Sequence, residues 1–494
     1  MDSSASIDVG ALVTSPVFWA AGAFVGFLSL LLARLSCYVF PGKSPPIFEG
    51  IPLIGGMLKF LGGPIKLIQE GYEKCGDVFT VPVFHKKITF LIGPSVTPHF
   101  FKASDELVSQ KEVYEFNVPT FGPGVVYDVE PKVRNEQFRF FADALKTQRL
   151  QEYVPLFKLE AKDFFEKYGD TGVVDLGNEL GDLITLTASR TLLGREIREN
   201  LYDQVSLYLK HLDEGMLPIS VFFPYLPIPA HRKRDEARKQ LAETFKKVLR
   251  ARRESGAKEP DMLQHFMESR YQKNFNGRLL NDDEIGGLLI AALFAGQHTS
   301  SITSAWTGYC LLDNRKWWDK VVEEQKRIVK EHGDNLDVDV LNDMPVLHSC
   351  IKEALRMNPP LVMLLRQNRK DFSVTTKDGK QYVVPKGNIL ATSATFTHRL
   401  SSLFKNPMSF EPDRSDPPRE EDKEPLKNIS FGHGRHSCMG HTFAYLQIKV
   451  IWSIIVRNFE MELVDEFPEP DFDAMVIGPK KCRIRYTRRK NPLV

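Results

Sequence analysis

The chain has 494 residues, of which 43% are hydrophobic and 26% charged, a composition typical of a large folded protein and not of a disordered one. Its 65 Lys and Arg residues nearly balance 63 Asp and Glu residues, which argues against nucleic-acid binding, because that function needs a basic excess. The six cysteines lie far apart without a pairing pattern, so we expect reduced thiols in a reducing compartment.

The N-terminal segment at residues 11–32 carries no charged side chain. A helix of this length spans ~33 Å, about one hydrocarbon core of a membrane. Arg34 and Lys43 follow the segment, which predicts that the bulk of the chain faces the cytosol. A cleaved signal peptide would need a basic leading region, which this sequence lacks, and a buried core helix is the other alternative. We expect residues 1–40 to be a single-pass membrane anchor.

The residues after this anchor are rich in Pro and Gly, which cannot continue the helix. We interpret residues 41–50 as a linker and 51–494 as one folded domain, because no internal repeat or later domain break is found. Short β-like runs are expected between 51 and 100, and long helical patterns between 133 and 360. The helices are predicted at 133–145, 150–167 and 282–312.

The C-terminal third of the sequence mixes the two kinds of pattern. Residues 372–393 alternate like strands around an Asp378-Gly379 turn signal, and residues 404–430 indicate a long irregular loop. A helix is predicted at 441–458, followed by a β-like tail. The fold class is therefore mainly α with a small β region.

One further apolar segment, at residues 217–227, is too short and too rich in Pro to span a membrane. We predict that it dips into the membrane interface and forms an entrance for an apolar substrate. The alternative is a buried loop.

The stretch that is most informative about function runs from Phe431 to Gly440 and reads FGHGRHSCMG. Gly434 and Gly440 are expected to let the backbone wrap closely around a cofactor. Cys438 lies just ahead of a predicted helix, whose dipole and free N–H groups favour a thiolate. A thiolate is the haem ligand that favours O–O bond cleavage, so we predict that Cys438 is the axial ligand of a haem iron and that His436 donates to a haem propionate.

Other interpretations of this loop remain open from its residues alone. A lone cysteine in a glycine loop is inert in most proteins. The histidines around Cys438 are also of the types that bind zinc, although the second ligand pair of a structural site is missing. The glycine spacing does not match the G-x-G-x-x-G pattern of a dinucleotide-binding loop.

Two further motifs favour the haem interpretation. Glu353 and Arg356 lie three residues apart on one predicted helix, and Arg414 follows in the stretch FEPDR. A buried Glu–Arg–Arg network is costly, and bracing the cysteine loop is a role that would justify it; a solvated surface pair is the alternative.

The second of these motifs is AGQHTS, at residues 295–300, in the middle of the long apolar helix. Gly296 costs roughly 1 kcal/mol of helix propensity and is expected to open a groove for dioxygen and water. Thr299 is predicted to hydrogen-bond a bound oxygen species, and His298 to pass protons. The alternative is a core helix in which Thr299 and His298 are satisfied internally.

With these three motifs in this order, the sequence resembles the cytochrome P450 superfamily. It is similar in particular to the sterol 14α-demethylase family, on the GQHT stretch at Gly296–Thr299 and on YEFNVPTFGPGVVYD at Tyr114–Asp128. The resemblance covers residues 40–490 and is closest to plant- or alga-like members. It implies the P450 fold, with haem b between the helix that bears Gly296 and the loop that bears Cys438.

The resemblance also implies roles for individual residues. His298 pairs with Asp213 for proton delivery, and both act with Thr299 in catalysis. Residues otherwise expected to be core aromatics or core side chains become ligand contacts. The haem propionates are expected to contact Tyr114, Tyr127, Arg366 and His436, and the sterol to contact Phe116, Phe121, Leu361 and Met363.

The implied reaction is a three-step, O2- and NADPH-dependent removal of the sterol 14α-methyl group as formate, leaving a C14–C15 double bond. Phe116 is the plant-type residue and implies obtusifoliol as the substrate, because a flat ring occupies the space of a second C4 methyl group. The implied location is the endoplasmic reticulum membrane, with the catalytic domain facing the cytosol. Azole inhibitors are further implied ligands.

Electrons must come from a partner, because the sequence carries no flavin or nicotinamide loop. The resemblance implies an NADPH-dependent flavoprotein reductase. Cations near the cysteine loop are candidates for its docking face, with an ordinary solvated surface as the alternative for each. They are Lys427, Arg435, Lys449 and Arg457.

The sequence departs from the family pattern at His433, where relatives often have a small residue, and at His441, where an acidic residue is frequent. Both departures concern reductase docking and not haem binding. Two other functions are retained as alternatives: a haem-thiolate hydroxylase of another lipid, and a membrane-anchored lipid-binding protein without turnover.

Overall fold

The structure is a computed structural model that describes residues 44–48, 63–83, 86–472 and 475–493, together with positions 22, 25, 26, 56 and 59. The anchor expected at residues 1–40 lies outside the described residues, apart from three isolated positions. Within the described part, one helix is long and apolar enough to cross a membrane, α15 (Asp282–Asp313). Residues along most of α15 are buried by the rest of the protein, so we interpret it as a core helix.

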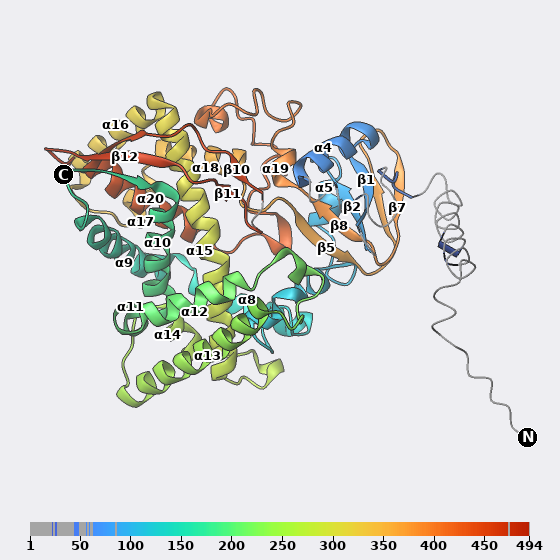
Figure 1. The fold of residues 1–494 in the computed structure, drawn as a ribbon, viewed down its shortest axis with the longest axis horizontal. Coiled ribbons are helices and arrows are strands. Elements are labelled where there is room, and N and C mark those ends of the chain that lie inside the picture. Colours follow the sequence, from blue (N-terminus) through green and yellow to red (C-terminus); the bar gives the residue numbers. More distant parts are fainter. Residues whose placement is uncertain are drawn as a thin grey trace, which may run out of the picture.

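Helices form most of the molecule, and α15 runs through its centre (Figure 1). It packs against α10, α13, α18 and α20, which surround it with apolar side chains. The longer helices are α4 (Pro64–Cys75), α8 (Pro131–Ala144), α9 (Thr147–Glu166), α10 (Leu176–Ala188), α12 (Tyr202–Glu214), α13 (Pro229–Ser255), α15, α16 (Arg315–His332), α18 (Pro345–Met357) and α20 (His441–Asn458).

Short helices and turns connect these elements. The short α-helices are α5 (Thr97–Phe101), α6 (Lys111–Tyr114), α7 (Val118–Phe121), α11 (Arg195–Asn200), α14 (Met262–Glu268), α17 (Val338–Asn342) and α19 (Ala394–Thr397). The 3₁₀ turns are η1 (Glu115–Asn117), η3 (Pro218–Val221), η4 (Lys273–Phe275), η5 (Pro412–Ser415) and η6 (Gly434–His436), and η2 (Ser189–Leu193) is a π turn that extends α10.

The β region lies to one side of the helices, with α4 and α5 beside it (Figure 1). Its main sheet has the order β1-β2-β8-β5-β3, in which β2 and β8 are parallel and the other pairs antiparallel. A separate sheet, β4-β12-β9, joins the C-terminal tail to the helical part, and β6-β7 and β10-β11 form two-stranded ribbons. The strands are β1 (Val78–Val83), β2 (Lys86–Leu91), β3 (Val108–Ser109), β4 (Thr171–Asp175), β5 (Leu364–Asn368), β6 (Phe372–Thr375), β7 (Gln381–Val384), β8 (Ile389–Thr392), β9 (Phe459–Leu463), β10 (Pro470–Asp471), β11 (Gly478–Pro479) and β12 (Arg483–Arg488).

The mainly α prediction is confirmed, and α20 has the predicted bounds. The Asp378-Gly379 turn joins β6 to β7, with Gly379 in the left-handed region at φ 81°. The long segment 404–430 contains only the short η5 turn, as expected for an irregular loop.

Trp452 on α20 joins that helix to α15. Trp452 Nε1 donates to the carbonyl oxygen of Ser304 at 3.2 Å and to its Oγ at 3.0 Å. The indole packs against Gly308, where a Cβ would lie 2.5 Å from the Trp452 ring. This contact joins the helix that follows the cysteine loop to the helix that carries Thr299.

Candidate active site

The cysteine loop is a tight, internally bonded turn between the irregular segment and α20. The backbone N–H of Cys438 donates to the Phe431 carbonyl at 2.8 Å, which closes the loop. Gly432 and Gly434 adopt positive φ values of 67° and 68°, and a Cβ at Gly434 would lie 2.6 Å from the Phe101 carbonyl oxygen. Gly440 has φ −86°, and a Cβ there would lie 3.9 Å from Cys438 Sγ, so its close approach to the cofactor stays a prediction.

The thiol of Cys438 lies directly before the N-terminus of α20. Its pKa is raised, because burial outweighs the opposing effect of the Gly440 N–H. The N–H group at this helix terminus acts in the direction of the predicted thiolate, and burial acts against it. A coordinated metal ion deprotonates a thiol outright, so ligation would supply what the helix does not.

The Glu353–Arg356–Arg414 network is buried as predicted, and its three side chains are almost inaccessible to solvent. Glu353 accepts from Arg356 at 2.7 and 2.9 Å and from Arg414 Nε at 2.9 Å. Arg356 and Arg414 also donate to backbone carbonyls of the segment between α19 and α20, and Arg414 NH1 contacts both the Lys405 carbonyl and the Glu421 carboxylate. The other carbonyls are those of His398 and Pro407 for Arg356, and of Asn406 and Ser409 for Arg414.

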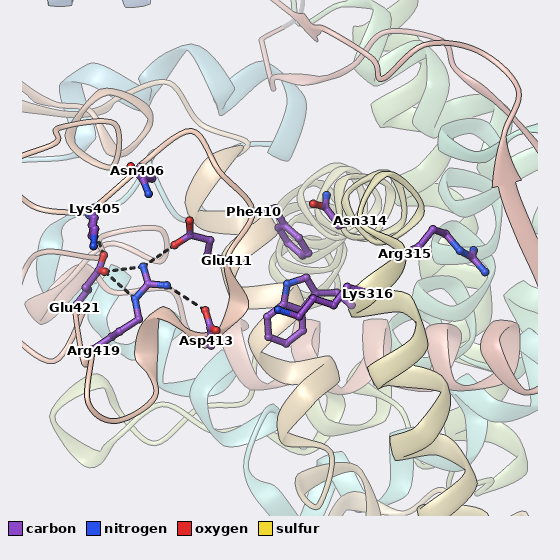
Figure 2. Close-up of a pocket in the computed structure, with 11 residues that line it drawn as sticks. Asn314, Arg315, Lys316, Lys405, Asn406, Phe410, Glu411, Asp413, Arg419 and Glu421 are labelled. Carbon is purple, nitrogen blue, oxygen red and sulfur yellow. Dashed lines mark hydrogen bonds and ion pairs between the residues drawn. The ribbon is translucent and has the colours of Figure 1, made fainter.

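The outer part of this network reaches the protein surface. Glu421 accepts from Arg414 at 2.9 Å and from Arg419 at 2.7 Å. Arg419 also holds Glu411 and Asp413, and these residues line a surface groove beside Asn314 and Phe410 (Figure 2). Because its carboxylates are already paired and it contains none of the predicted catalytic residues, we regard this groove as part of the bracing structure.

Sequence reasoning missed His398, which ties the network to the cysteine loop. His398 Nδ1 donates to the Arg356 carbonyl at 3.0 Å, and its Nε2 accepts from the Ile429 N–H at 2.9 Å. Both bonds require a neutral imidazole, and burial lowers the pKa of His398 to about 3. A histidine between strand β8 and an irregular loop carries no sequence pattern that would have revealed this role.

The middle of α15 departs from the burial of the rest of that helix. Ala295 is exposed and residues 296–299 are half-buried, and a Cβ added at Gly296 would meet no atom within 4 Å. The Thr299 hydroxyl donates to the Ala295 carbonyl at 2.7 Å, so its oxygen is left to accept a hydrogen bond. The groove predicted at Gly296 is therefore consistent with the structure.

His298 and Asp213 form the predicted pair. His298 Nε2 and Asp213 Oδ1 are 3.1 Å apart, which joins α15 to the end of α12. The hydrogen bond to Asp213 raises the pKa of His298 and outweighs the opposing effect of burial.

Aromatic side chains from three segments form a continuous row toward His298. Tyr114 and Tyr127 stack with centroids 5.4 Å apart, and Phe116 lies 6.5 Å from Tyr114. Phe121 lies 6.3 Å from Tyr127 and 6.1 Å from Phe294, whose ring is 6.3 Å from His298. The row thus brings predicted cofactor and substrate contacts together beside the middle of α15.

Arg366 on β5 is a buried cation that has no carboxylate within ion-pair distance among the described residues. Burial lowers the pKa of Arg366, and its NH1 donates to the Leu365 carbonyl at 2.7 Å. The Tyr114 hydroxyl accepts from the Leu365 N–H at 3.3 Å, so Tyr114 and Arg366 share this edge of the sheet. A buried guanidinium without an acidic partner fits a site for an anionic group.

The other two predicted substrate contacts lie between α18 and β5. Met363 packs against the cluster around Tyr114, whereas Leu361 is 42% exposed. The tail also approaches this region: the Ile477 N–H donates to the Pro360 carbonyl at 2.8 Å, and Gly478 faces Ile302 on α15. Ile302 and Ile477 are candidate wall residues that the sequence analysis did not include.

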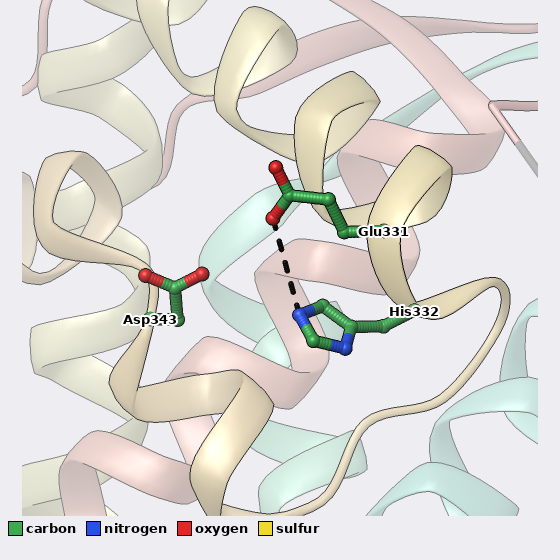
Figure 3. Close-up of side chains that lie close together, drawn as sticks. All are labelled: Glu331, His332 and Asp343. Atoms are coloured by element: carbon green, nitrogen blue, oxygen red, sulfur yellow. Dashed lines mark ion pairs between the residues drawn. The ribbon is translucent and has the colours of Figure 1, made fainter.

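The zinc alternative for the cysteine loop is not supported. Within the described residues, the group of histidine and acidic side chains close enough to share an ion is Glu331, His332 and Asp343, far along the sequence from Cys438 (Figure 3). Arg327 donates to both carboxylates, at 2.9 and 2.6 Å, which accounts for that cluster without a metal.

Two of the four predicted docking cations are not on the surface. Lys449 and Arg457 are 4% and 1% exposed, and Lys449 Nζ donates to the Leu341 carbonyl at 2.7 Å. Burial lowers the pKa of Lys449 to about 8. Lys427 is half-buried and paired with Glu424 at 3.0 Å, so Arg435 remains as the exposed candidate.

Comparison with known proteins decides the family. The cytochrome P450 family model matches residues 45–485. The chain belongs to the cytochrome P450 family. P450s are haem-thiolate proteins that use O2, which agrees with the motif around Cys438.

Relatives within the P450 family are sterol 14-demethylases. The chain is 57% identical to obtusifoliol 14-alpha demethylase of Triticum aestivum, over 91% of this chain and 99% of the relative. It is 55% identical to sterol 14-demethylase of Arabidopsis thaliana, with 94% and 96% covered. Lanosterol 14-alpha demethylase of Homo sapiens is 37% identical, with 90% and 87% covered.

The P450 fold is also that of a solved structure. Retinoic acid-bound cyanobacterial CYP120A1 matches with a TM-score of 0.78 over 91% of this chain and 100% of that chain, at 21% identity. This likeness supports the mainly α fold with small sheets.

His398 should make the stability of this P450 sensitive to acid. Because its folded pKa of about 3 lies below the ~6.5 of an unfolded chain, the unfolded state binds more protons between these values. The contribution is complete above pH ~6.5 and is lost as the pH falls toward 3. Between pH 7 and 5 this linkage lowers the free energy of unfolding by about 2 kcal/mol. Urea denaturation at the two pH values should therefore show a smaller loss of stability in His398→Gln than in the parent.

The matched control is His332→Gln, which changes an exposed histidine and should lose as much stability between pH 7 and 5 as the parent does. An equal acid loss in the parent and His398→Gln would contradict the buried neutral state of His398.

Proposed function

We propose that this P450 is the sterol 14-demethylase of a sterol biosynthesis pathway and that obtusifoliol is its substrate. The observation that carries the proposal is the aromatic row from Phe116 to His298, which lies beside the open middle of α15. Relatives named obtusifoliol 14-alpha demethylase support the substrate. The reaction removes the 14α-methyl group as formate in three oxidations and leaves a C14–C15 double bond.

The haem fits the residues of the proposed site. Cys438 supplies the thiolate ligand, and Arg366, with Tyr114 and Tyr127, supplies cationic and hydroxyl groups for the propionates. When bound, the haem supplies the activation of O2 and the oxidising chemistry. His436 is the remaining predicted propionate contact.

The protein's own residues supply protons and position. Thr299 offers an acceptor oxygen next to the groove at Gly296. The hydrogen bond to Asp213 raises the pKa of His298, so this imidazole binds a proton more tightly than a free one. His298 lies on the same helix as Thr299 and can release that proton toward the groove. Asp213 lies near the end of α12 and connects this proton to solvent.

The sterol pocket is proposed to be walled by Phe116, Phe121, Leu361 and Met363. Their rings and aliphatic chains match an apolar, rigid ligand and exclude water from the reacting carbon. Azole inhibitors would use the same pocket. A lipid hydroxylase would share the cysteine loop but would have no need of this row.

The proposed organisation is an anchor at 1–40, a linker at 41–50 and one haem domain at 51–494. Electrons are proposed to come from an NADPH-dependent reductase, for which exposed Arg435 is the candidate contact. The proposed location is the endoplasmic reticulum membrane, with the haem domain in the cytosol.

The segment 217–227 is proposed as a second membrane contact. Ile219, Phe223 and Tyr225 are 41%, 45% and 68% exposed, so the buried-loop alternative is wrong for these side chains. Phe222 packs against the apolar cluster of the β region that contains Phe48.

Deletion of residues 1–40 should leave measurable affinity for phosphatidylcholine liposomes. Adding Phe223→Ser and Tyr225→Ser to the truncated protein should weaken flotation with liposomes at least roughly tenfold, because each burial contributes ~1.5–3 kcal/mol. Leu207→Ser on α12, an exposed apolar residue elsewhere, is the control. A truncated protein with no liposome affinity would remove this second contact.

The proposed function is tested by the reduced carbon-monoxide spectrum followed by turnover of a sterol panel. The parent should give the thiolate-type Soret band and release formate from obtusifoliol, and Cys438→Ala should lose the band, because it lacks the ligand sulfur. A band without demethylation of any sterol would favour hydroxylation of another lipid. No band in the parent would favour a non-catalytic lipid-binding protein.

Replacing Asp213 should slow turnover without weakening sterol binding. Asp213→Asn keeps the size but removes the charge that raises the pKa of His298, so proton delivery should fall at least about tenfold. Sterol affinity, from the spectral titration, should stay within about twofold. Glu214→Gln, next in the chain and exposed, is the control, and equal turnover in Asp213→Asn and parent would remove the pair from the mechanism.

Phe116→Leu should broaden substrate use toward 4,4-dimethyl sterols while leaving the haem spectrum unchanged. One methyl group in an apolar pocket discriminates by ~1–3 kcal/mol, so the preference for obtusifoliol over lanosterol should fall by roughly 10- to 200-fold. Turnover ratios for the two sterols in both proteins measure the change. An unchanged ratio would make Phe116 a packing residue.

A further inference from the structure

One polar side chain of the AGQHTS stretch, Gln297, is not used by the proposed mechanism. It lies between Gly296, which opens the groove, and His298, which holds the proton. Successive residues of an α-helix are turned by ~100° about its axis, so Gln297 and Thr299 are ~200° apart. Gln297 therefore lies on nearly the opposite face of α15 from Thr299.

The side chain of Gln297 bonds to α10, which packs alongside α15 (Figure 1). Its Nε2 donates to Thr185 Oγ1 at 2.9 Å. Thr185 is buried, and its hydroxyl donates to the Gly181 carbonyl at 2.8 Å, so the Thr185 oxygen is left to accept. The direction of both hydrogen bonds is thus determined, and α10 holds Gln297 through one buried acceptor.

This hydrogen bond acts on a part of α15 that has little rigidity of its own. The hydroxyls of Thr299, Thr303 and Thr307 each donate to the carbonyl four residues earlier, at 2.7, 2.7 and 2.8 Å. Such bonds compete with the hydrogen bonds of the helix and often bend it. Gly296 also lowers the helix propensity of this turn. The orientation of the turn therefore depends on contacts with the neighbouring helices.

Two polar contacts hold this turn from different sides. His298 Nε2 lies 3.1 Å from Asp213 Oδ1 on α12, and Gln297 bonds to Thr185 on α10. The Asp213 side chain is 51% exposed, so water competes for that contact. Thr185 is 8% exposed, and a hydrogen bond shielded from water is the stronger of the two kinds. The contact behind the helix is therefore the one better suited to fix its orientation.

We infer that Gln297 is a positioning residue, whose hydrogen bond to Thr185 sets the rotation of α15 so that Thr299 and His298 face the groove. A rotation of ~20° moves a Cα atom by ~0.8 Å at the helix radius of about 2.3 Å, and it moves side-chain atoms further. A displacement of about 1 Å at a reacting group can slow a reaction roughly 100-fold. This inference rests on the proposed function and adds to it a residue that acts through its neighbours.

The test compares stability with the use of electrons in Gln297→Leu, Thr185→Val and the double variant. Each single variant leaves a polar group without its partner and should lower the urea midpoint of the full-length holoprotein. The double variant replaces both partners by apolar groups of similar shape, so its midpoint should return close to that of the parent. A role in stability alone would therefore disappear in the double variant.

The use of electrons is measured with an NADPH-dependent P450 reductase and obtusifoliol. Electrons that do not oxidise the sterol convert NADPH, H⁺ and O2 into NADP⁺ and hydrogen peroxide. Peroxide released per NADPH oxidised should rise at least about threefold in both single variants, because Thr299 and His298 are displaced. It should stay raised in the double variant without multiplying, because both changes remove the same bond. A double variant with the peroxide release of the parent would overturn the inference and make Gln297 a packing residue.

Thr187→Val is the matched control. Gln447 on α20 donates to Thr187 at 2.8 Å, so the same kind of bond reaches α10 from a helix that does not carry Thr299. This variant should lower the urea midpoint and keep the peroxide release of the parent. An equal rise of peroxide in Thr187→Val would mean that any loosening around α10 has this effect, and would contradict a specific role of Gln297.

Hydrogen exchange gives a measurement that needs neither sterol nor reductase. Backbone amides at 296–303 of the ferric holoprotein should exchange roughly three- to tenfold faster in Gln297→Leu than in the parent. Thr185→Val should show the same change and replaces Gln297→Leu if that variant does not fold. Exchange at the parent rate in these variants would overturn the inference. A parent that demethylates no sterol would instead remove the proposed function, and the exchange result would still be readable.

Discussion

One buried carboxylate, Glu353, supports the part of the molecule that has least structure of its own. Backbone hydrogen bonds within the segment between α19 and α20 close short turns, and several of its buried carbonyl groups are satisfied by side chains instead. Arg356 and Arg414 do this, and both are held in place by Glu353. Burying three charges costs several kcal/mol per ion, yet apolar side chains could not bind the carbonyls, so the network persists where packing alone would fail.

The same principle operates around the cysteine loop. His398 bonds to the Arg356 carbonyl and to the Ile429 N–H, just before the cysteine loop. Asp105 bonds to His436 within the loop. Both contacts join residues far apart in sequence and position an irregular turn to which strand pairing contributes nothing. The loop is thus oriented by buried polar side chains whose hydrogen bonds are all made. Removal of one partner leaves the other buried without a hydrogen bond, which costs more free energy than the net contribution of that bond.

The features of the fold and the site that depend on neighbouring residues could be predicted from the sequence, and those that depend on distant partners could not. Helix α20 was predicted at its observed bounds because its apolar run begins after a glycine and ends before strand β9, and the Asp378-Gly379 hairpin follows from turn chemistry. His398 and Asp105 were missed, because the contacts of single polar residues in irregular segments depend on partners far away in the sequence. Lys449 and Arg457 were misplaced although α20 is apolar on nearly every face, a pattern that already indicates burial of its cations.

The proposed substrate wall depends on stiffness as much as on shape. A single methyl group changes binding by only ~1–3 kcal/mol, and a ring that could swing aside would forfeit part of that difference. Phe116 lies at the end of a row in which Tyr114 and Tyr127 stack, and Tyr127 is in turn packed by Phe121 against Phe294 of α15. Tyr114, Tyr127 and Phe121 each lie between two other rings and have little freedom to move, and Tyr114 in turn supports Phe116 from one side. The aromatic row therefore gives the proposed pocket the rigidity that discrimination by one methyl group requires.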